Sequence, residues 1–416
     1  MIQENQDYQK RVKRVEEAIA LKTPDRVPFF PITGLMARKY IRITAEEAFY
    51  NYEAWFQANK KMILDLEPDM YWPAVAVYPG RALEAVKIRQ LRWPGPGGAP
   101  KDTGIQFVEG EYMKADEYDL FIDDPTDYII RVYLPRVFDS LEPLKNIPPI
   151  KMLFYGGYRG ILTSAVLADP ALVKALESLY KTALESAAFL KALAEFNEAM
   201  AGLGFPVAFG GGVIRAPFDV FSDVHRGMRG SMLDMYRQPD KLLEAMEKVT
   251  PILIQDAVLA AKRSGIKRIF IPLHRGADGF MSDEQFQRLY WPGLKRVMLE
   301  LIDADLTPCP LFEGRYASRL EYLNTLPKGK VMGMFDNTDI AKAKEIVGDT
   351  ICICGNMPVS VLQMGTPEKV RELTKQQIEA AGRGGGFIMC CKGVLDEADP
   401  ELVKVWAEAT REYGDY

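Results

Sequence analysis

Histidine is scarce in this sequence, with only two in 416 residues. No Gly-x-Ser-x-Gly motif is present either, so a Ser-His-Asp hydrolase has little support. The glycine triplets at 210–212 and 384–386 do not match the Gly-x-Gly-x-x-Gly dinucleotide fingerprint, and the P-loop pattern is absent. A Ser-His-Asp hydrolase, a dinucleotide-binding enzyme and a P-loop enzyme are therefore all without support in the sequence.

Cysteine is also sparse, and its five copies fall in the last third of the chain. An odd number at this density does not suit a secreted disulfide scaffold. The N-terminal stretch MIQENQDYQKRVKRVEEAIA lacks the apolar core of a signal peptide, and no run of 18 apolar residues occurs. We therefore expect a cytoplasmic protein with reduced thiols, not a membrane protein.

The charge balance excludes another class of partner. The chain has 52 basic and 57 acidic residues, a net charge of −5, and no long basic run. Nucleic acid is therefore an unfavourable partner. The 48% hydrophobic content is that of an ordinary globular protein with a large core.

Helix starts and apolar runs alternate along most of the chain. Capping signals occur at Thr44 with Glu47, Ser282 with Gln285, Thr366-Pro367 and Asp399-Pro400. Eight nearly continuous apolar runs indicate strands of a covered parallel sheet, at 27–33, 69–77, 206–212, 267–273, 306–312, 330–335, 350–354 and 385–391. This alternation predicts the α/β class and a (β/α)8 TIM barrel. An open doubly wound sheet is the alternative.

Residues at about 80–150 interrupt the alternation, since they are rich in proline, glycine, tryptophan and acidic residues. We interpret them as an insertion with a hairpin and short helices, within one barrel domain that spans 1–416. Loops of this length commonly act as lids or assembly surfaces.

Polar side chains follow most of the expected strands. Because TIM-barrel sites form at the carboxyl ends of the strands, these residues are candidates for one common site. They are Arg215, Asp219, His274, Arg275, Asp278, Glu313, Arg315, Asp336, Asn337, Asn356, Cys390, Cys391 and Lys392. Together they would suit an anionic or polar substrate. Asp339 is more typical of a helix N-cap.

The cysteines allow a metal site or simple core packing. Cys352 and Cys354 point to one face of their strand, but structural zinc sites mostly use Cys-x2-Cys turns. Small apolar packing is the alternative for this pair, and Cys309 is expected in the core. Cys390 and Cys391 end the last strand and remain ligand candidates.

Several segments resemble the uroporphyrinogen decarboxylase superfamily. They are RVEEAIALKTPDRVPFFP, FMSDEQFQRLYWPGLK, GKVMGMFDNTDI, GNMPVSVLQMGTPE and GGFIMCCKG. The resemblance covers nearly the whole chain outside 80–150, and it implies a (β/α)8 barrel. It also implies one of two chemistries, which are decarboxylation of a porphyrinogen and methyl transfer with a corrinoid protein.

The departures from this superfamily favour the methyltransferase branch. The decarboxylases carry an arginine-rich N-terminal segment, of which DRVPFFPITGLMARKYI keeps only Arg38 and Lys39. The methyltransferases commonly hold zinc through a His-x-Cys at the fifth strand and a cysteine after the eighth. This chain instead has Leu311-x-Glu313, and its last cysteines lie two or three residues upstream of the usual position.

Two hypotheses follow for the site. One is an altered zinc site formed by Glu313, His274 and Cys391, and the other is a metal-free pocket with Glu313 as a general acid. In both, a carboxylate in place of a thiolate suits protonation of a leaving oxygen better than activation of a thiol.

We therefore predict a corrinoid-dependent methyltransferase, the demethylase component for a small methylated compound such as an aryl methyl ether. Its partner would be a corrinoid protein whose cobalt takes the methyl group, and the insertion would close over the substrate or receive that partner. The predicted catalytic residues are Glu313, His274 and Asp336, and the predicted substrate-binding residues are Arg215, Asp219, Asn356 and Arg315. A decarboxylase and a non-catalytic barrel that binds a corrinoid or small ligand are the alternatives.

Overall fold

The computed structural model describes residues 5–155, 157–210 and 212–416. Its main sheet is parallel and follows the order β1-β9-β7-β6-β5-β4, with the short β8 also paired to β9. The strands are β1 (Phe29–Phe30), β4 (Arg268–Leu273), β5 (Thr307–Phe312), β6 (Met332–Phe335), β7 (Cys352–Cys354), β8 (Met357–Pro358) and β9 (Phe387–Lys392). Six of the eight expected strands thus form regular ladders.

The other two expected strands take part in the barrel through isolated bridges. The Asp69 amide donates to the Phe29 carbonyl at 2.9 Å, and Tyr71 pairs with Val207 in parallel. Val213 then pairs with Phe270 of β4. These links complete a ring of eight parallel segments, so the (β/α)8 barrel is confirmed over the open sheet. Residue 211, part of the expected third strand, lies outside the described residues.

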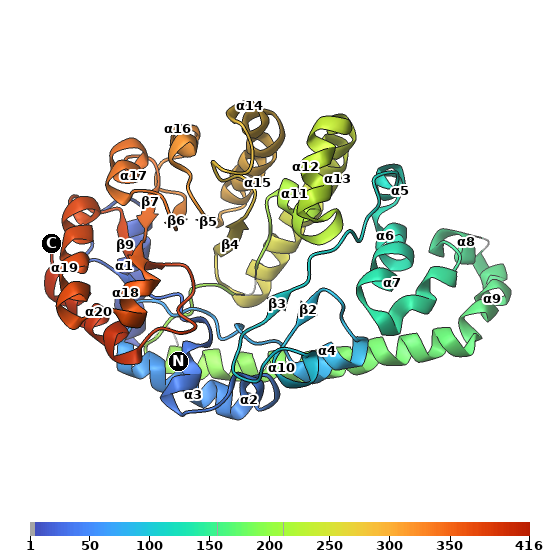
Figure 1. Ribbon diagram of the computed structural model, residues 1–416, viewed down its shortest axis with the longest axis horizontal. Helices are drawn as coiled ribbons and strands as arrows, with labels where there is room; N and C mark the ends of the chain where they lie inside the picture. Colours follow the sequence, from blue (N-terminus) through green and yellow to red (C-terminus); the bar gives the residue numbers. More distant parts are fainter. Residues whose placement is uncertain (1–4, 156, 211) are drawn as a thin grey trace.

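Helices surround the sheet on its outer side (Figure 1). Their starts follow the sequence signals: the side chains of Thr44, Thr366 and Asp399 each accept an amide of the following turn, and Ser282 and Gln285 form a reciprocal capping box. The helices around the barrel are α1 (Gln6–Ile19), α2 (Ala45–Tyr50), α3 (Tyr52–Leu66), α10 (Pro170–Gly202), α11 (Pro217–Asp219), α12 (Gly227–Arg237), α13 (Pro239–Ser264), α14 (Asp283–Gln285), α15 (Trp291–Asp303), α16 (Leu320–Leu323), α17 (Ile340–Val347), α18 (Val359–Met364), α19 (Pro367–Gln377) and α20 (Pro400–Tyr413). In the described ranges, no helix is long and apolar enough to cross a membrane.

The core lies inside the barrel and between the strands and helices. Phe29 of β1 packs edge-to-face on Trp406 of α20, with ring centroids 4.7 Å apart. Cys309, Cys352 and Cys354 are completely buried, and burial raises the pKa of the Cys309 and Cys354 thiols above their usual range. These thiols therefore pack as small apolar side chains.

The insertion contains a two-stranded antiparallel ladder of β2 (Leu91–Arg92) and β3 (Gln106–Phe107). Short helices accompany it: α4 (Gly80–Val86), α5 (Tyr118–Asp123), α6 (Pro125–Tyr128), α7 (Leu134–Val137), α8 (Ile150–Phe154) and α9 (Gly160–Thr163). The irregular segment continues past 150 to Asp169, which caps α10. The insertion is thus longer than the sequence indicated, because α10 begins only at Pro170.

Helix α10 is 33 residues long and reaches well beyond the barrel. Figure 1 shows α8 and α9 at the far end of α10, away from the main sheet. A small separate apolar cluster, which includes Leu141, Leu144, Leu153 and Leu172, holds this end together. We call residues 134–190 the arm.

Candidate functional site

The candidate site lies where β4 and β5 end, at the carboxyl-terminal side of the barrel. His274 follows β4, and Glu313 follows β5. The two side chains meet, with His274 Nε2 3.6 Å from Glu313 Oε1. The structure thus brings together two of the three residues that the sequence predicted as catalytic.

His274 is held in its charged form. Its Nδ1 contacts the Asp223 carboxylate, and about a quarter of the side chain is exposed. Burial alone would lower the pKa of His274, but the neighbouring carboxylates of Asp223 and Glu313 raise it to about 10. The imidazolium therefore persists at neutral pH, with its Nε2 proton directed toward Glu313.

Asp223 is a site residue that the sequence reasoning missed. Besides His274, it faces Arg215 Nε and Arg275 Nη2, each at 3.5 Å from a carboxylate oxygen. Burial raises the pKa of Asp223, but these three cations hold it below its usual value. The sequence feature that could have identified Asp223 is its position four residues after Asp219, since the two lie on one face of the helical segment 217–225.

Asp219 has a different role from the predicted contact with substrate. It is completely buried, and its carboxylate accepts hydrogen bonds from the His274 amide at 2.9 Å, the Arg275 amide at 3.1 Å and the Tyr290 hydroxyl at 2.6 Å. Burial and the neighbouring Asp223 raise its pKa to about 6. Because all these partners are internal, Asp219 positions the loop that carries His274.

The arginines divide between the site and its rim. Arg215 and Arg275 flank Asp223, and within the described residues the Nε of neither has a hydrogen-bond acceptor. Both guanidiniums thus lie beside the His274–Asp223 pair, with their Nε atoms buried. Arg315 is 72% exposed and pairs instead with Asp278 at 3.3 Å, so the structure does not bring it into the His274 site.

Asp336 and Asn356 tie the neighbouring strand ends together. Asp336 Oδ2 accepts from the Gly314 amide at 3.0 Å, directly beside Glu313. Asn356 Nδ2 donates to the carbonyls of Asp336 and Thr338 at 3.0 and 2.8 Å. These bonds link the loops after β5, β6 and β7, and so they fix the backbone next to Glu313. Asp339 is the N-cap of α17, as expected.

The predicted ligand set of Glu313, His274 and Cys391 is not assembled. Cys391 is buried, and its Sγ accepts a hydrogen bond from the Ile32 amide at 3.2 Å. Within the described part of the chain, no three His, Cys, Asp or Glu side chains are grouped so that they could hold a metal ion. The described residues therefore do not fit the altered zinc site that was one of the two hypotheses from the sequence.

We expect Cys391→Ala to leave the metal content and the activity of the purified protein unchanged. The reason is that this thiol faces the backbone of Ile32, and metal analysis by mass spectrometry checks it. Cys352→Ala, at a buried position on β7, is the matched control for loss of core volume. Stoichiometric zinc that disappears only in Cys391→Ala would contradict the expectation.

The second histidine is part of the core. His225 lies among Phe121, Tyr128, Tyr133 and Phe221, with the Tyr133 ring centroid 4.8 Å away. Burial lowers its pKa to about 4, so the ring is neutral at physiological pH. It does not contribute to the charged cluster around His274.

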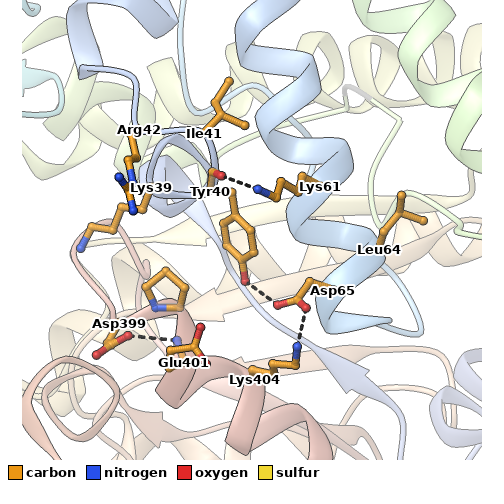
Figure 2. A pocket seen from close by; sticks show the side chains of 11 residues that line it. Lys39, Tyr40, Ile41, Arg42, Lys61, Leu64, Asp65, Asp399, Glu401 and Lys404 are labelled. Carbon is orange, nitrogen blue, oxygen red and sulfur yellow. Dashed lines mark hydrogen bonds and ion pairs between the residues drawn. The ribbon is translucent and has the colours of Figure 1, made fainter.

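A cavity of about 900 Å³ lies between α3, α20 and residues 39–42 (Figure 2), and neither His274 nor Glu313 lines it. Its charged side chains are mostly satisfied by one another: Lys404 pairs with Asp65 at 2.6 Å, and Lys61 donates to the Tyr40 carbonyl at 3.0 Å. Nearby, Arg38 and Lys39 both pair with Glu397. This groove therefore has the character of a solvated surface.

Comparison with known proteins gives a consistent picture of the fold. A model of the uroporphyrinogen decarboxylase (URO-D) family matches residues 161–413. Uroporphyrinogen decarboxylase of Chlorobium phaeobacteroides is 36% identical over 85 residues, 20% of this chain and 24% of that protein. The enzyme of Syntrophotalea carbinolica is 27% identical over 168 residues, 40% of this chain and 47% of that protein. The chain thus spans less than half the length of these two curated relatives.

A solved structure matches over nearly the whole length. A methyltransferase from Methanosarcina mazei superposes with a TM-score of 0.62 and 16% identity, covering 96% of this chain and 98% of that one. At this identity the likeness establishes the shared fold, including the parts of the chain that the family model does not match.

Proposed function

The chain belongs to the uroporphyrinogen decarboxylase family, and we propose that within this family it is a methyltransferase that works with a corrinoid protein. The observation that carries the proposal is the His274 imidazolium, held by Asp223 and facing Glu313 at the barrel mouth. The substrate would be a small methyl ether, and the methyl acceptor would be the cobalt of the partner's corrinoid.

The reaction needs an acid at the leaving oxygen. The bond between the methyl carbon and oxygen breaks with its electron pair left on oxygen, and that oxygen takes the Nε2 proton of His274. Cobalt(I) supplies the electron pair of the new bond to carbon, and its formal state rises to cobalt(III). The products are an alcohol and a methylated corrinoid, so atoms and electrons balance.

The acidity of His274 favours an aryl ether as substrate. A phenol such as the tyrosine side chain has a pKa of about 10, and the pKa of His274 is also about 10. Matched values allow the proton to move as the oxygen acquires charge. The 3.6 Å gap between His274 Nε2 and Glu313 is longer than a hydrogen bond, so a substrate oxygen can compete for this proton.

The decarboxylase alternative draws its support from the names of the curated relatives. Against it, the cationic residues in the region where decarboxylases bind substrate carboxylates are already paired. Arg38 contacts Glu397 at 2.7 Å, and Lys39 lies 3.3 Å from the same carboxylate. Binding a polycarboxylate there would require these ion pairs to separate.

One assay separates these functions. Purified protein is mixed with aryl methyl ethers and either cobalt(I) corrinoid protein or free cob(I)alamin, and loss of the cobalt(I) absorption is followed. We expect loss that depends on both enzyme and ether. An unchanged spectrum with release of carbon dioxide from porphyrinogen would support the decarboxylase, and no turnover in either assay would support a non-catalytic barrel.

Glu313→Gln is expected to move the basic limb of the pH–rate profile below 10. Removing this carboxylate charge withdraws part of what raises the pKa of His274. The initial rate measured as a function of pH checks the shift. Glu321→Gln, at an exposed position on α16, is the control and should behave as wild type. An unshifted limb in Glu313→Gln would contradict the coupling.

A further inference from the structure

Helix α10 has three distinct faces over residues 172–190. One is buried against α3, α4 and residues 139–146 and includes Leu172, Ala175 and Phe189. The second carries alternating charges: Lys174, Glu177, Lys181 and Glu185. The third spans about 140° of the helix and is entirely apolar or aromatic. Its members are Val173, Leu176, Leu179, Tyr180, Ala183, Leu184, Ala187 and Leu190, and all of them are exposed.

The spacing of the third face is that of a helix seam. Val173, Leu176, Tyr180, Ala183, Ala187 and Leu190 follow one another at intervals of three, four, three, four and three residues. Such a 3.5-residue repeat keeps one stripe facing a partner helix in a coiled coil. A helix surrounded by solvent does not need an apolar stripe with this repeat. The exposure of its large side chains is high, and that of Tyr180 is 65%.

We propose that the arm is a dimerisation element, and that α10 pairs along this seam, antiparallel, with α10 of a second copy of the chain. The order of intervals reads the same in both directions, so a two-fold axis between Tyr180 and Ala183 superposes the seam on itself. An isologous interface requires this self-complementarity, which a seam for an unrelated partner does not.

The layers of such a pair also match in size. Tyr180 lies opposite Ala183 of the other copy, and Leu176 lies opposite Ala187 of the other copy. These two layers each set a large side chain against a small one, which is how side chains interdigitate at native density, and in the outer layer Val173 lies opposite Leu190. The Glu and Lys residues stay on the second face, outside the seam.

The apolar surface continues beyond α10 onto α8 and α9. Met152, Tyr155, Ile161 and Leu162 are exposed there, Tyr155 by 93%. The arm's own apolar cluster is small, so cover from a second copy would also stabilise its fold. In Figure 1, α10 runs along the edge of the molecule opposite α14 and α16.

Solution mass tests the proposal. Sedimentation of the full chain is expected to give twice the chain mass of 46.8 kDa. Leu176→Glu combined with Tyr180→Glu should weaken the dimer by roughly a hundredfold. Lys181→Glu, on the charged face of the same helix, is the matched control and should leave the dimer intact. A wild-type monomer, or a dimer unaffected by the double substitution, would overturn the proposal.

Cross-linking tests the direction of pairing. Val173→Cys mixed with Leu190→Cys should give a disulfide-linked dimer on oxidation, whereas Val173→Cys alone should not. The native cysteines are all buried, so they contribute little background. Cross-linking of Val173→Cys alone and not of the mixture would indicate a parallel pair and overturn the antiparallel arrangement.

Discussion

Replacing His274 by alanine is expected to lower the rate of methyl transfer by about two to four orders of magnitude. The substitution removes the proton that the leaving oxygen would take. It also leaves Asp223 with Arg215 and Arg275 as partners at 3.5 Å, so the charge of this carboxylate stays balanced and the fold is retained. Single-turnover loss of the cobalt(I) absorption, with circular dichroism as a check on folding, measures the effect.

The positioning role of Asp223 provides the companion experiment. Asp223→Asn keeps His274 in place but removes the main charge that raises its pKa, so the basic limb of the pH–rate profile should move from about 10 toward neutral pH. A merely structural role would change the rate at all pH values equally. Full activity of His274→Ala would remove His274 from the mechanism.

The same histidine links stability to pH. Its pKa is about 10 in the folded protein, against about 6.5 when unfolded. The folded state therefore binds the proton more tightly, and this contribution to stability is complete below pH ~6.5 and is lost as pH rises through about 10. The free energy of unfolding of the wild type, measured by denaturant titration, should therefore fall more steeply over this pH range than that of His274→Ala.

Asp69→Ala is expected to lower the free energy of unfolding by about 3–5 kcal/mol, the usual cost of removing one member of a buried charged cluster. Asp69 is fully buried and accepts from the Arg26 guanidinium at 2.8 and 2.9 Å and from the Phe29 amide at 2.8 Å. Arg14 also pairs with it. The substitution would leave the partly buried Arg26 guanidinium without this carboxylate, and Arg14 would keep only Asp25.

Urea or guanidinium titration followed by circular dichroism checks this value. Glu195→Ala is the control, because Glu195 forms an exposed ion pair with Lys191 within helix α10 and should change stability little. A loss for Asp69→Ala no larger than that of the control would show that the cluster around Asp69 does not stabilise the barrel.

The sequence predicts the fold where local signals and burial agree. The apolar runs of β4 to β9 are continuous and became ladders, and the caps at Thr44, Ser282, Thr366 and Asp399 begin helices. The runs at 69–77 and 206–212 pair only through isolated bridges, and proline or glycine content does not explain this, since β4, β5 and β6 contain these residues and still form ladders. The Asp169-Pro170 cap, a signal of the same kind as Asp399-Pro400, marks the true end of the insertion.

The candidate site was predictable only in part. Position at a strand end identifies His274 and Glu313, because barrel geometry brings such residues together. It does not distinguish Asp219, which is buried, from Asp223, which touches the imidazole, since both occupy one helical face. Cys391 also ends a strand, but its thiol turns to the backbone of Ile32. Side-chain direction is set by packing that spacing alone does not encode.

The uneven pairing around the barrel has a consequence for how this enzyme can diversify. The insertion leaves and rejoins the ring beside the bridged segments at 69–71 and 206–208, while His274 and Glu313 extend from the laddered β4 and β5. Lengthening a surface loop adds little to the entropic cost of closing it. The bridged half of the ring can therefore accept longer loops while His274 and Glu313, on the laddered half, keep their geometry.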